Sequence, residues 1–326
     1  MRINKLILPM LVPAMLTPAT VLAQSAAPNY PSKSIRFIVP FPPGGGTDIG
    51  TRVIAQKLSE RYQQQVIVDN RGGAAGIIGT ELAAKAPPDG YTLMMGNIGT
   101  HAINISLYKK LPYDPVRDFA PVTQAAGLPL FVLVHPSLPV RNAKELISFA
   151  KAQPGLNYSS SGSGGSMHMA AELFQNMTGV KFTHVPYKGG GPAVVDLIAG
   201  QVSLSFATVL ETSQHVKSNR LRALAVTSAG RSIAFPAIPT VAEAALPGYE
   251  SISWLGVFAP AATPREIVAQ LNTEIVRILS LPDVKERLLG QGAEPIGNSV
   301  ERFTAVLKSD IAKYSKLLKA AGVSLE

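Results

Sequence analysis

A glycine-rich loop near the start of the chain has the residue types that bind an anion. The loop runs from Phe41 to Asp48, and Gly45 and Gly46 directly precede Thr47. Glycine lets the backbone approach a ligand closely, and a helix that begins at Thr47 or Asp48 presents free N–H groups and a partial positive charge. We therefore predict an anion-binding loop, with a simple tight turn as the alternative.

A second loop adds serine hydroxyls to the same arrangement. The segment from Ser159 to Ser166 joins a predicted strand to a predicted helix. Hydroxyl and N–H donors of this kind bind a carboxylate without needing arginine. The candidate ligand-binding residues of this loop and the helix start are Ser160, Ser161, Ser163, Gly164, Gly165 and His168.

The second loop also allows an enzymatic interpretation, with Ser163 or Ser166 as a nucleophile and His168 as its base. The G-x-S-x-G elbow of serine hydrolases does not occur, because the position two after Gly162 holds Gly164 instead of serine. His168 also lies in the first turn of the predicted helix, where it can cap or pack. A serine hydrolase of carboxylic esters is the alternative function.

A third loop follows another predicted strand end. It runs from Gly96 to His101, and its polar residues Asn97, Thr100 and His101 could orient a ligand. The alternative is a histidine whose hydrogen bonds serve only the loop itself. These three residues are further candidates for the binding site.

Nucleotide and metal motifs are missing from the sequence. A G-x-G-x-x-G fingerprint from Gly44 needs glycine where Ile49 stands, and a P-loop from Gly45 needs lysine where Thr51 stands. The five histidines show no H-E-x-x-H spacing, and the cysteine count is zero. We predict neither a metal site nor a cofactor.

The charge of the chain is positive but spread along the sequence. The 30 Lys and Arg outnumber the 21 Asp and Glu, for a formal net charge of +9, yet only Lys109 and Lys110 form an adjacent basic pair. Nucleic-acid binding usually needs clustered basic residues, and an aromatic fraction of 6% offers no stacking platform. We predict no nucleic-acid partner. A binder of nucleic acid or of an anionic surface, driven by the positive charge and steeply dependent on salt, is kept as a third hypothesis.

The N-terminal segment has the features of a secretory signal peptide. Arg2 and Lys5 precede an apolar stretch from Leu6 to Leu22, which three prolines interrupt. Cleavage after Ala23 would lower the formal net charge from +9 to +7; cleavage after Ala27 is a second option. We therefore predict a signal peptide over residues 1–23 and export to the periplasm.

Strands alternate with helices along the rest of the chain, which predicts an α/β fold with largely parallel sheets. At 326 residues, about two domains are expected. The series of predicted strands covers 35–39, 66–68, 91–95, 131–134, 157–159, 182–185, 202–206, 221–226 and 252–258. The first predicted helix begins at Thr47 or Asp48. The other predicted helices cover 74–86, 143–151, 166–177, 192–199, 264–279, 282–289 and 300–320.

Several sequence blocks resemble the Bug family, the periplasmic solute-binding components of tripartite tricarboxylate transporters. The resemblance covers essentially the whole chain after the predicted signal peptide. The blocks that carry it are residues 30–48, 69–76, 88–93, 111–119, 158–168 and 185–189.

This resemblance implies a two-lobed periplasmic-binding-protein fold of the second type, with the ligand cleft between the lobes. One lobe would hold residues 28–124 plus 250–326, and the other residues 125–249. Strands crossing near 122–126 and 249–253 would form the hinge.

The resemblance also implies how a ligand is held. Backbone N–H groups of the loops at 41–48 and 160–165, together with bound water, would pinch a carboxylate. Thr47 and Asp48 would face the ligand, Phe41 would cover it, and Thr208 with the 96–101 loop would set specificity.

We therefore predict an exported binding protein, not an enzyme, for a small carboxylate. A dicarboxylate, a tricarboxylate, an acidic amino acid and an aromatic acid all fit these loops. Partners would be the ligand and the membrane subunits of a tripartite tricarboxylate-type transporter, and a monomer is expected.

Overall fold

The computed structural model describes residues 30–321, and the predicted signal peptide lies outside them. From Pro31 onward, strands and helices alternate through most of the chain. Strand order is β2 (Val66–Asn70), β1 (Ile35–Val39), β3 (Thr92–Asn97), β9 (Ile252–Pro260), β4 (Phe119–Val134), β7 (Leu204–Thr208), β5 (Asn157–Ser160) and β6 (Thr183–Pro186); β8 (Arg222–Val226) and β10 (Glu294–Pro295) also pair with β4. The expected α/β class is confirmed.

The first half of this arrangement is a parallel sheet with its covering helices. β1 pairs in parallel with β2 on one side and with β3 on the other. The elements are β1 (Ile35–Val39), α1 (Gly46–Tyr62), β2 (Val66–Asn70), a 3-10 turn (Ala74–Gly76), α2 (Ile77–Ala84), β3 (Thr92–Asn97), a π-helix (Gly99–Ile103) and α3 (Asn104–Leu107).

The second half repeats the pattern. β5 pairs in parallel with β6 and β7, and both β7 and β8 pair with β4. Its elements are α4 (Ala143–Ala152), β5 (Asn157–Ser160), α5 (Ser166–Thr178), β6 (Thr183–Pro186), α6 (Gly190–Ile198), β7 (Leu204–Thr208), α7 (Val209–Lys217), β8 (Arg222–Val226) and α8 (Val241–Ala244).

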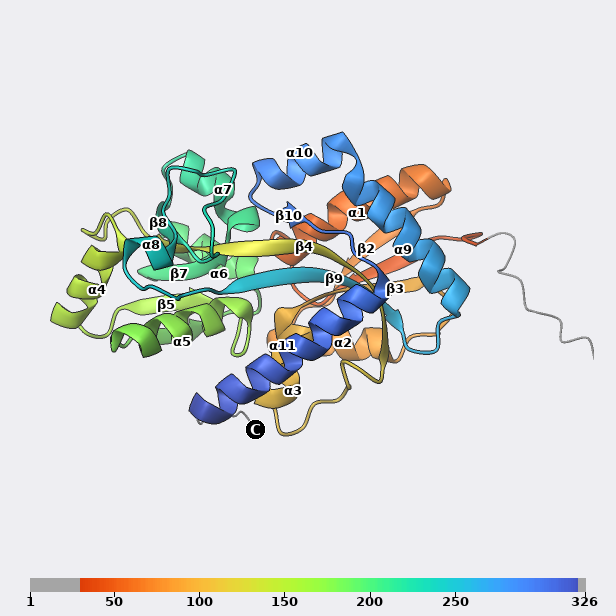
Figure 1. The fold of residues 1–326 in the computed structure, drawn as a ribbon, viewed down its shortest axis with the longest axis horizontal. Helices are drawn as coiled ribbons and strands as arrows, with labels where there is room; N and C mark the ends of the chain where they lie inside the picture. The colour runs from red at the N-terminus through yellow and green to blue at the C-terminus, as the bar shows by residue number, and fades with distance from the viewer. Residues whose placement is uncertain (1–29, 322–326) are drawn as a thin grey trace, which may run out of the picture. The chain divides into compact units, whose positions relative to one another are not determined.

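Two long antiparallel strands connect the halves (Figure 1). β4 (Phe119–Val134) pairs with β9 (Ile252–Pro260) over its first eleven residues, and its last residues pair with β7 and β8. The β4–β9 ladder shifts register twice, between 121 and 123 and between 124 and 126. Because one strand belongs to both sheets, the ends of the two sheets are held next to each other.

The expectation of largely parallel sheets is wrong, because every pairing made by β4 and β9 is antiparallel. The predicted strand at 131–134 is only the end of β4. Its earlier part contains Pro121, Gly127 and Pro129, which weaken a strand signal in the sequence.

The C-terminal segment supplies helices that cover the first half. They are α9 (Arg265–Ser280), α10 (Pro282–Gly290) and α11 (Val300–Ala321), with the short strand β10 (Glu294–Pro295) before α11. Phe303 and Leu307 of α11 are buried against Phe258 and Trp254. Within residues 30–321, no helix has the length and apolar character needed to cross a membrane.

Two apolar clusters of the described residues lie in different halves of the fold. The larger contains only residues between Leu130 and Tyr249, among them Phe131, Phe174 and Phe206. The other combines residues from Ile38 to Phe119 with residues from Trp254 to Leu318. The chain therefore leaves the first half of the fold along β4 and returns to it along β9.

Gly256→Ala tests the packing of α11 on β9. A Cβ on Gly256 would overlap the Phe303 ring and lie 3.0 Å from Phe258. Overpacking of this kind costs about 1–3 kcal/mol, so we expect a lower urea midpoint of unfolding. The control is Gly290→Ala, whose Cβ meets nothing within 4 Å; equal stability of the two variants would contradict the packing.

Candidate functional site

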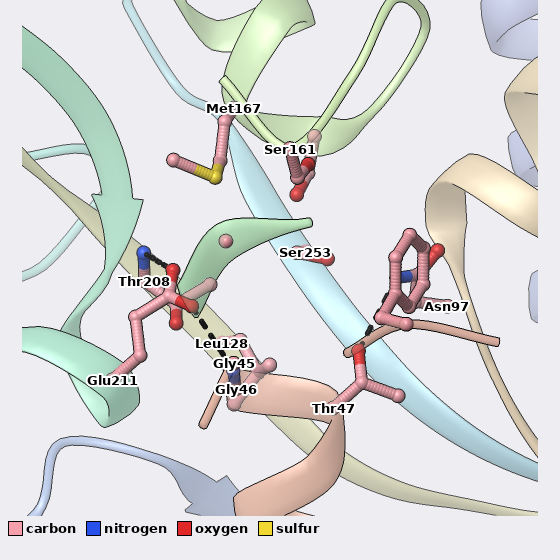
Figure 2. Close-up of a pocket in the computed structure, with 13 residues that line it drawn as sticks. Gly45, Gly46, Thr47, Asn97, Leu128, Ser161, Met167, Thr208, Glu211 and Ser253 are labelled. Atoms are coloured by element: carbon pink, nitrogen blue, oxygen red, sulfur yellow. Dashed lines mark hydrogen bonds between the residues drawn. The ribbon is translucent and has the colours of Figure 1, made fainter. Parts of the chain in front are cut away.

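A cleft lies where the two halves of the fold meet. Figure 2 shows Ser161 and Met167 on one side of this space and Gly46 and Thr47 on the other. Its walls come from both halves and from the strands that connect them. The lining residues are Phe41, Gly45, Gly46, Thr47, Asn97, Leu128, Ser161, Ser166, Met167, Gly190, Thr208, Glu211 and Ser253.

The first predicted loop reaches the cleft through its backbone. α1 starts at Gly46, with Gly45 as its N-cap and no side chain capping it. The Gly46 N–H donates to Glu211 Oε2 at 3.0 Å, and no described residue accepts from the Thr47 N–H. The loop therefore presents the unpaired donor expected of an anion site.

Asp48 lies behind this loop instead of lining the cleft. Its carboxylate accepts hydrogen bonds from the Gly44 N–H and from Arg52 and Asn70, each at 3.0 Å. Burial raises the pKa of Asp48, but its bonds to Arg52 and the other donors outweigh this and hold the pKa below its ordinary value. The charge is thus already neutralised, and Asp48 fixes the loop that presents Thr47.

Asn70 supports Phe41, the residue predicted to cover the ligand, in the same way. Its amide donates to the Phe41 carbonyl oxygen at 3.0 Å and to Asp48 Oδ1. Phe41 is 7% exposed and lines the cleft. The backbone of the 41–48 loop is therefore anchored by Asp48 and Asn70, which are not among the residues that line the cleft.

Only some residues of the second loop line the cleft. Ser161, Ser166 and Met167 line the cleft, and Gly165 is the N-cap of α5. No described residue accepts from the N–H of Ser166 or of Met167. The first turn of α5 therefore offers free donors to the same space as α1.

The other predicted residues of this loop support it from behind. Ser160 is fully buried; its hydroxyl accepts from the Gly162 N–H at 3.1 Å and lies 2.6 Å from His184 Nε2. Tyr108 donates to the Ser163 carbonyl. Ser160, Ser163, Gly164, Gly165 and His168 are not among the lining residues.

Among the described residues, His168 makes no hydrogen bond to the candidate nucleophiles Ser163 and Ser166. Its Nδ1 accepts from the Gly164 N–H at 3.1 Å, its Nε2 lies 3.7 Å from Glu172, and its ring stacks on His184 at 4.3 Å. Burial lowers the pKa of His168 to about 4, so the ring is neutral at pH 7. It acts as the cap of the loop, the role named as the alternative to a base.

The third loop brings one side chain to the cleft. Thr100 N–H donates to Asn97 Oδ1, and Asn97 N–H donates to Thr100 Oγ1. This reciprocal pair directs the Asn97 amide toward Thr47 Oγ1, 3.4 Å away (Figure 2). Asn97 lines the cleft and Thr100 positions it.

His101 is fully buried inside the first half. It stacks on Phe258 at 3.8 Å, and its Nδ1 lies 2.9 Å from Thr100 Oγ1. The expected loop is a π-helix here, which turns the ring inward. Burial lowers the pKa of His101 to about 3.

Sequence reasoning missed several lining residues. Leu128 and Ser253 lie on β4 and β9, where nothing in the sequence separates a cleft residue from a core residue. Glu211 had a signal, because Thr208-x-x-Glu211 has the pattern of a capping box after a strand. The other missed residues are Met167 and Gly190, while Ser166 was considered only as a nucleophile.

Glu211 is the one charged residue among those that line the cleft in the described chain. Its carboxylate accepts from the Gly46 N–H and, at 2.9 Å, from the Thr208 N–H. Burial raises the pKa of Glu211 above its ordinary value, and these hydrogen bonds only partly offset it. Within residues 30–321, no cluster of three His, Cys, Asp or Glu side chains is arranged to hold a metal ion.

The comparison with known families is decisive. Residues 51–323 match the model of the tripartite tricarboxylate transporter family receptor, TctC. The chain belongs to this family. The resemblance to Bug proteins is confirmed as well, since the chain is 37% identical to protein BugT of Bordetella pertussis over 94% of this chain and 95% of BugT.

Two solved structures share the fold. The Rhodopseudomonas palustris protein Rpa4515, solved with adipate, is 41% identical, with a TM-score of 0.88 over 90% of this chain and 99% of that one. MatC of Rhodopseudomonas palustris, solved with bound malate, is 30% identical, with a TM-score of 0.84 over 89% of this chain and all of that one.

The buried histidines predict acid sensitivity. Burial lowers the pKa values of His101 to about 3 and of His168 and His184 to about 4, against about 6.5 unfolded. The folded state binds these protons less well than the unfolded state. The contribution of the neutral histidines to the free energy of unfolding is therefore fully present above about pH 6.5 and is lost as the pH falls toward 4. Urea unfolding at stepped pH measures this. His101→Leu should reduce the slope; an unchanged slope would contradict it.

Proposed function

We propose that this chain is a periplasmic solute-binding protein that captures a small carboxylate in the cleft. The ligand would then pass unchanged to the membrane subunits of a tripartite tricarboxylate-type transporter. The family match and the adipate and malate in two relatives support this proposal. Residues 28–124 plus 250–326 and residues 125–249 would be the lobes that close on the ligand.

The observation that carries the proposal is the meeting of three helix starts in one cleft. α1 contributes Thr47, α5 contributes Ser166 and Met167, and α6 contributes Gly190. No described residue accepts from the N–H groups of these residues. Free N–H groups at helix starts carry partial positive charge, and here they are the donors available to an anion, since neither Lys nor Arg lines the cleft.

The magnitudes suit a transport protein. A helix start stabilises an anion by about 0.3–1 kcal/mol, and by up to about 2 kcal/mol when partly buried. A hydrogen bond to a charged group adds about 1.5–3 kcal/mol. Three helix starts with the Ser161, Ser166 and Asn97 side chains can therefore supply the roughly 8 kcal/mol of a micromolar complex.

The structure gives less support to the hydrolase. A general base must come within hydrogen-bond reach of its nucleophile. In the described chain His168 makes no hydrogen bond to Ser163 or Ser166, and its Nδ1 is occupied by the Gly164 N–H. Binding without turnover is the function that this geometry favours.

A thermal-shift screen of the mature protein tests the proposal. The panel is a set of di- and tricarboxylates, acidic amino acids and aromatic acids, each with its uncharged amide. A bound acid at 100 times its Kd should stabilise the fold by about 2.7 kcal/mol, and its full amide should not. Absence of any shift, repeated after unfolding and refolding to remove a retained ligand, would refute carboxylate binding.

The serine hydroxyls that line the cleft should contribute directly to affinity. Loss of one hydrogen bond to a carboxylate costs about 1.5–3 kcal/mol, so Ser161→Ala and Ser166→Ala should each weaken binding about 10- to 150-fold. Isothermal titration calorimetry with the acid found in the screen measures this. Ser163→Ala, in the same loop but outside the lining, is the control and should bind normally; normal binding by all three would be inconsistent with the assignment.

A further inference from the structure

Glu211 reaches across the cleft to the start of α1. It lies on α7, in the second half of the fold, and Gly46 lies 165 residues earlier in the first half. Figure 2 shows its carboxylate between the N–H groups of Gly46 and Thr208. A carboxylate of the chain itself thus occupies the Gly46 N–H, one of the donors at the start of α1.

The surroundings of this carboxylate hold it in place without neutralising it. Glu211 Oε2 lies against Gly190, where even a Cβ would overlap it. No cation pairs with Glu211 among the described residues, since its partners are backbone N–H groups. Glu211 also lines a second hollow, together with His215 and Arg220.

A second polar group beside Glu211 is only loosely paired. Thr208 is 6% exposed and lines the cleft; its buried hydroxyl has the capping-box contact with the Glu211 backbone but makes no well-formed hydrogen bond to a described residue. A buried polar atom left in this way costs free energy until a ligand or water pairs with it. A hydroxyl both donates and accepts, so the Thr208 hydroxyl is a contact for a ligand group that reaches Glu211.

We propose that Glu211 determines which acids the cleft accepts. This inference rests on the proposed function. Because Glu211 occupies the Gly46 N–H of α1 and lies against Gly190 of α6, the ligand carboxylate binds at the free N–H groups of α5, on the other side of the cleft. The ligand group that meets Glu211 and Thr208 must then be a hydrogen-bond donor, such as an amide, hydroxyl or ammonium, because an ionised second carboxylate would face a like charge.

A capping role alone does not account for this arrangement. Glu243 stands at the same position of a second capping box, where it accepts from the Thr240 N–H. Glu243 is at the surface and pairs with Arg231, whereas Glu211 has no cation and borders a cleft. Capping needs no such placement, but selection among ligands by charge does.

Calorimetry with probes of equal length tests the proposal. The six-carbon set is adipate, its monoamide and 6-aminohexanoate; the four-carbon set is succinate, its monoamide and 4-aminobutyrate. At pH 7.5 the wild-type protein should bind the monoamide or the amino acid about 10-fold or more tightly than the diacid of that length. Glu211→Gln should remove or reverse this preference, and the matched variant Glu243→Gln should keep it.

The outcomes separate this inference from the function beneath it. If the wild-type protein binds a diacid at least as tightly as its monoamide, Glu211 does not select ligands, although carboxylate binding stands. This comparison needs no variant and therefore holds even if Glu211→Gln does not fold. An unchanged preference in folded Glu211→Gln would also overturn it. If the wild-type protein binds neither these probes nor any acid of the wider panel, the proposed function fails and the inference with it.

Discussion

The main constraint on this structure is that several helices start around one small cleft, whose described lining residues include neither Lys nor Arg. Helices that follow parallel strands begin at the same edge of a sheet, so each half of the chain directs its helix starts toward one end. β4 belongs to both sheets and brings the two edges together. The result is a cleft with unpaired N–H groups from α1, α5 and α6, which is a constraint that an anion relieves.

A division of labour surrounds the cleft. Most of the residues that line it are glycine, serine and threonine, whereas ionisable side chains such as Asp48 and His168 lie outside the lining and support the loops. Asp48 fixes the first loop and His168 caps the second, while Thr100 orients Asn97 in the third. Such backing residues hold donors in place before a ligand arrives, which lowers the ordering cost of binding.

Glu211 is the exception to this division, since it carries charge and also borders the cleft. Its carboxylate joins the start of α1 to the start of α7 across the two halves. A buried carboxylate without a cation is costly, and the raised pKa of Glu211 reflects that cost. Residues that serve ligand selection commonly reduce stability in this way.

Local sequence patterns were sufficient to predict the alternation of strands and helices, the three polar loops and the family, because hydrophobic period, glycine clusters and the order of sequence blocks can all be read along the chain. Seven of the residues predicted for the site line the cleft: Phe41, Gly45, Gly46, Thr47, Asn97, Ser161 and Thr208. Which polar residues face the ligand space depends on how the elements pack in three dimensions. Asp48 and His168 turn back to cap their own loops, His101 turns into the core, and Glu211 arrives from a helix 165 residues away. These outcomes depend on partners distant in sequence, which no local pattern specifies.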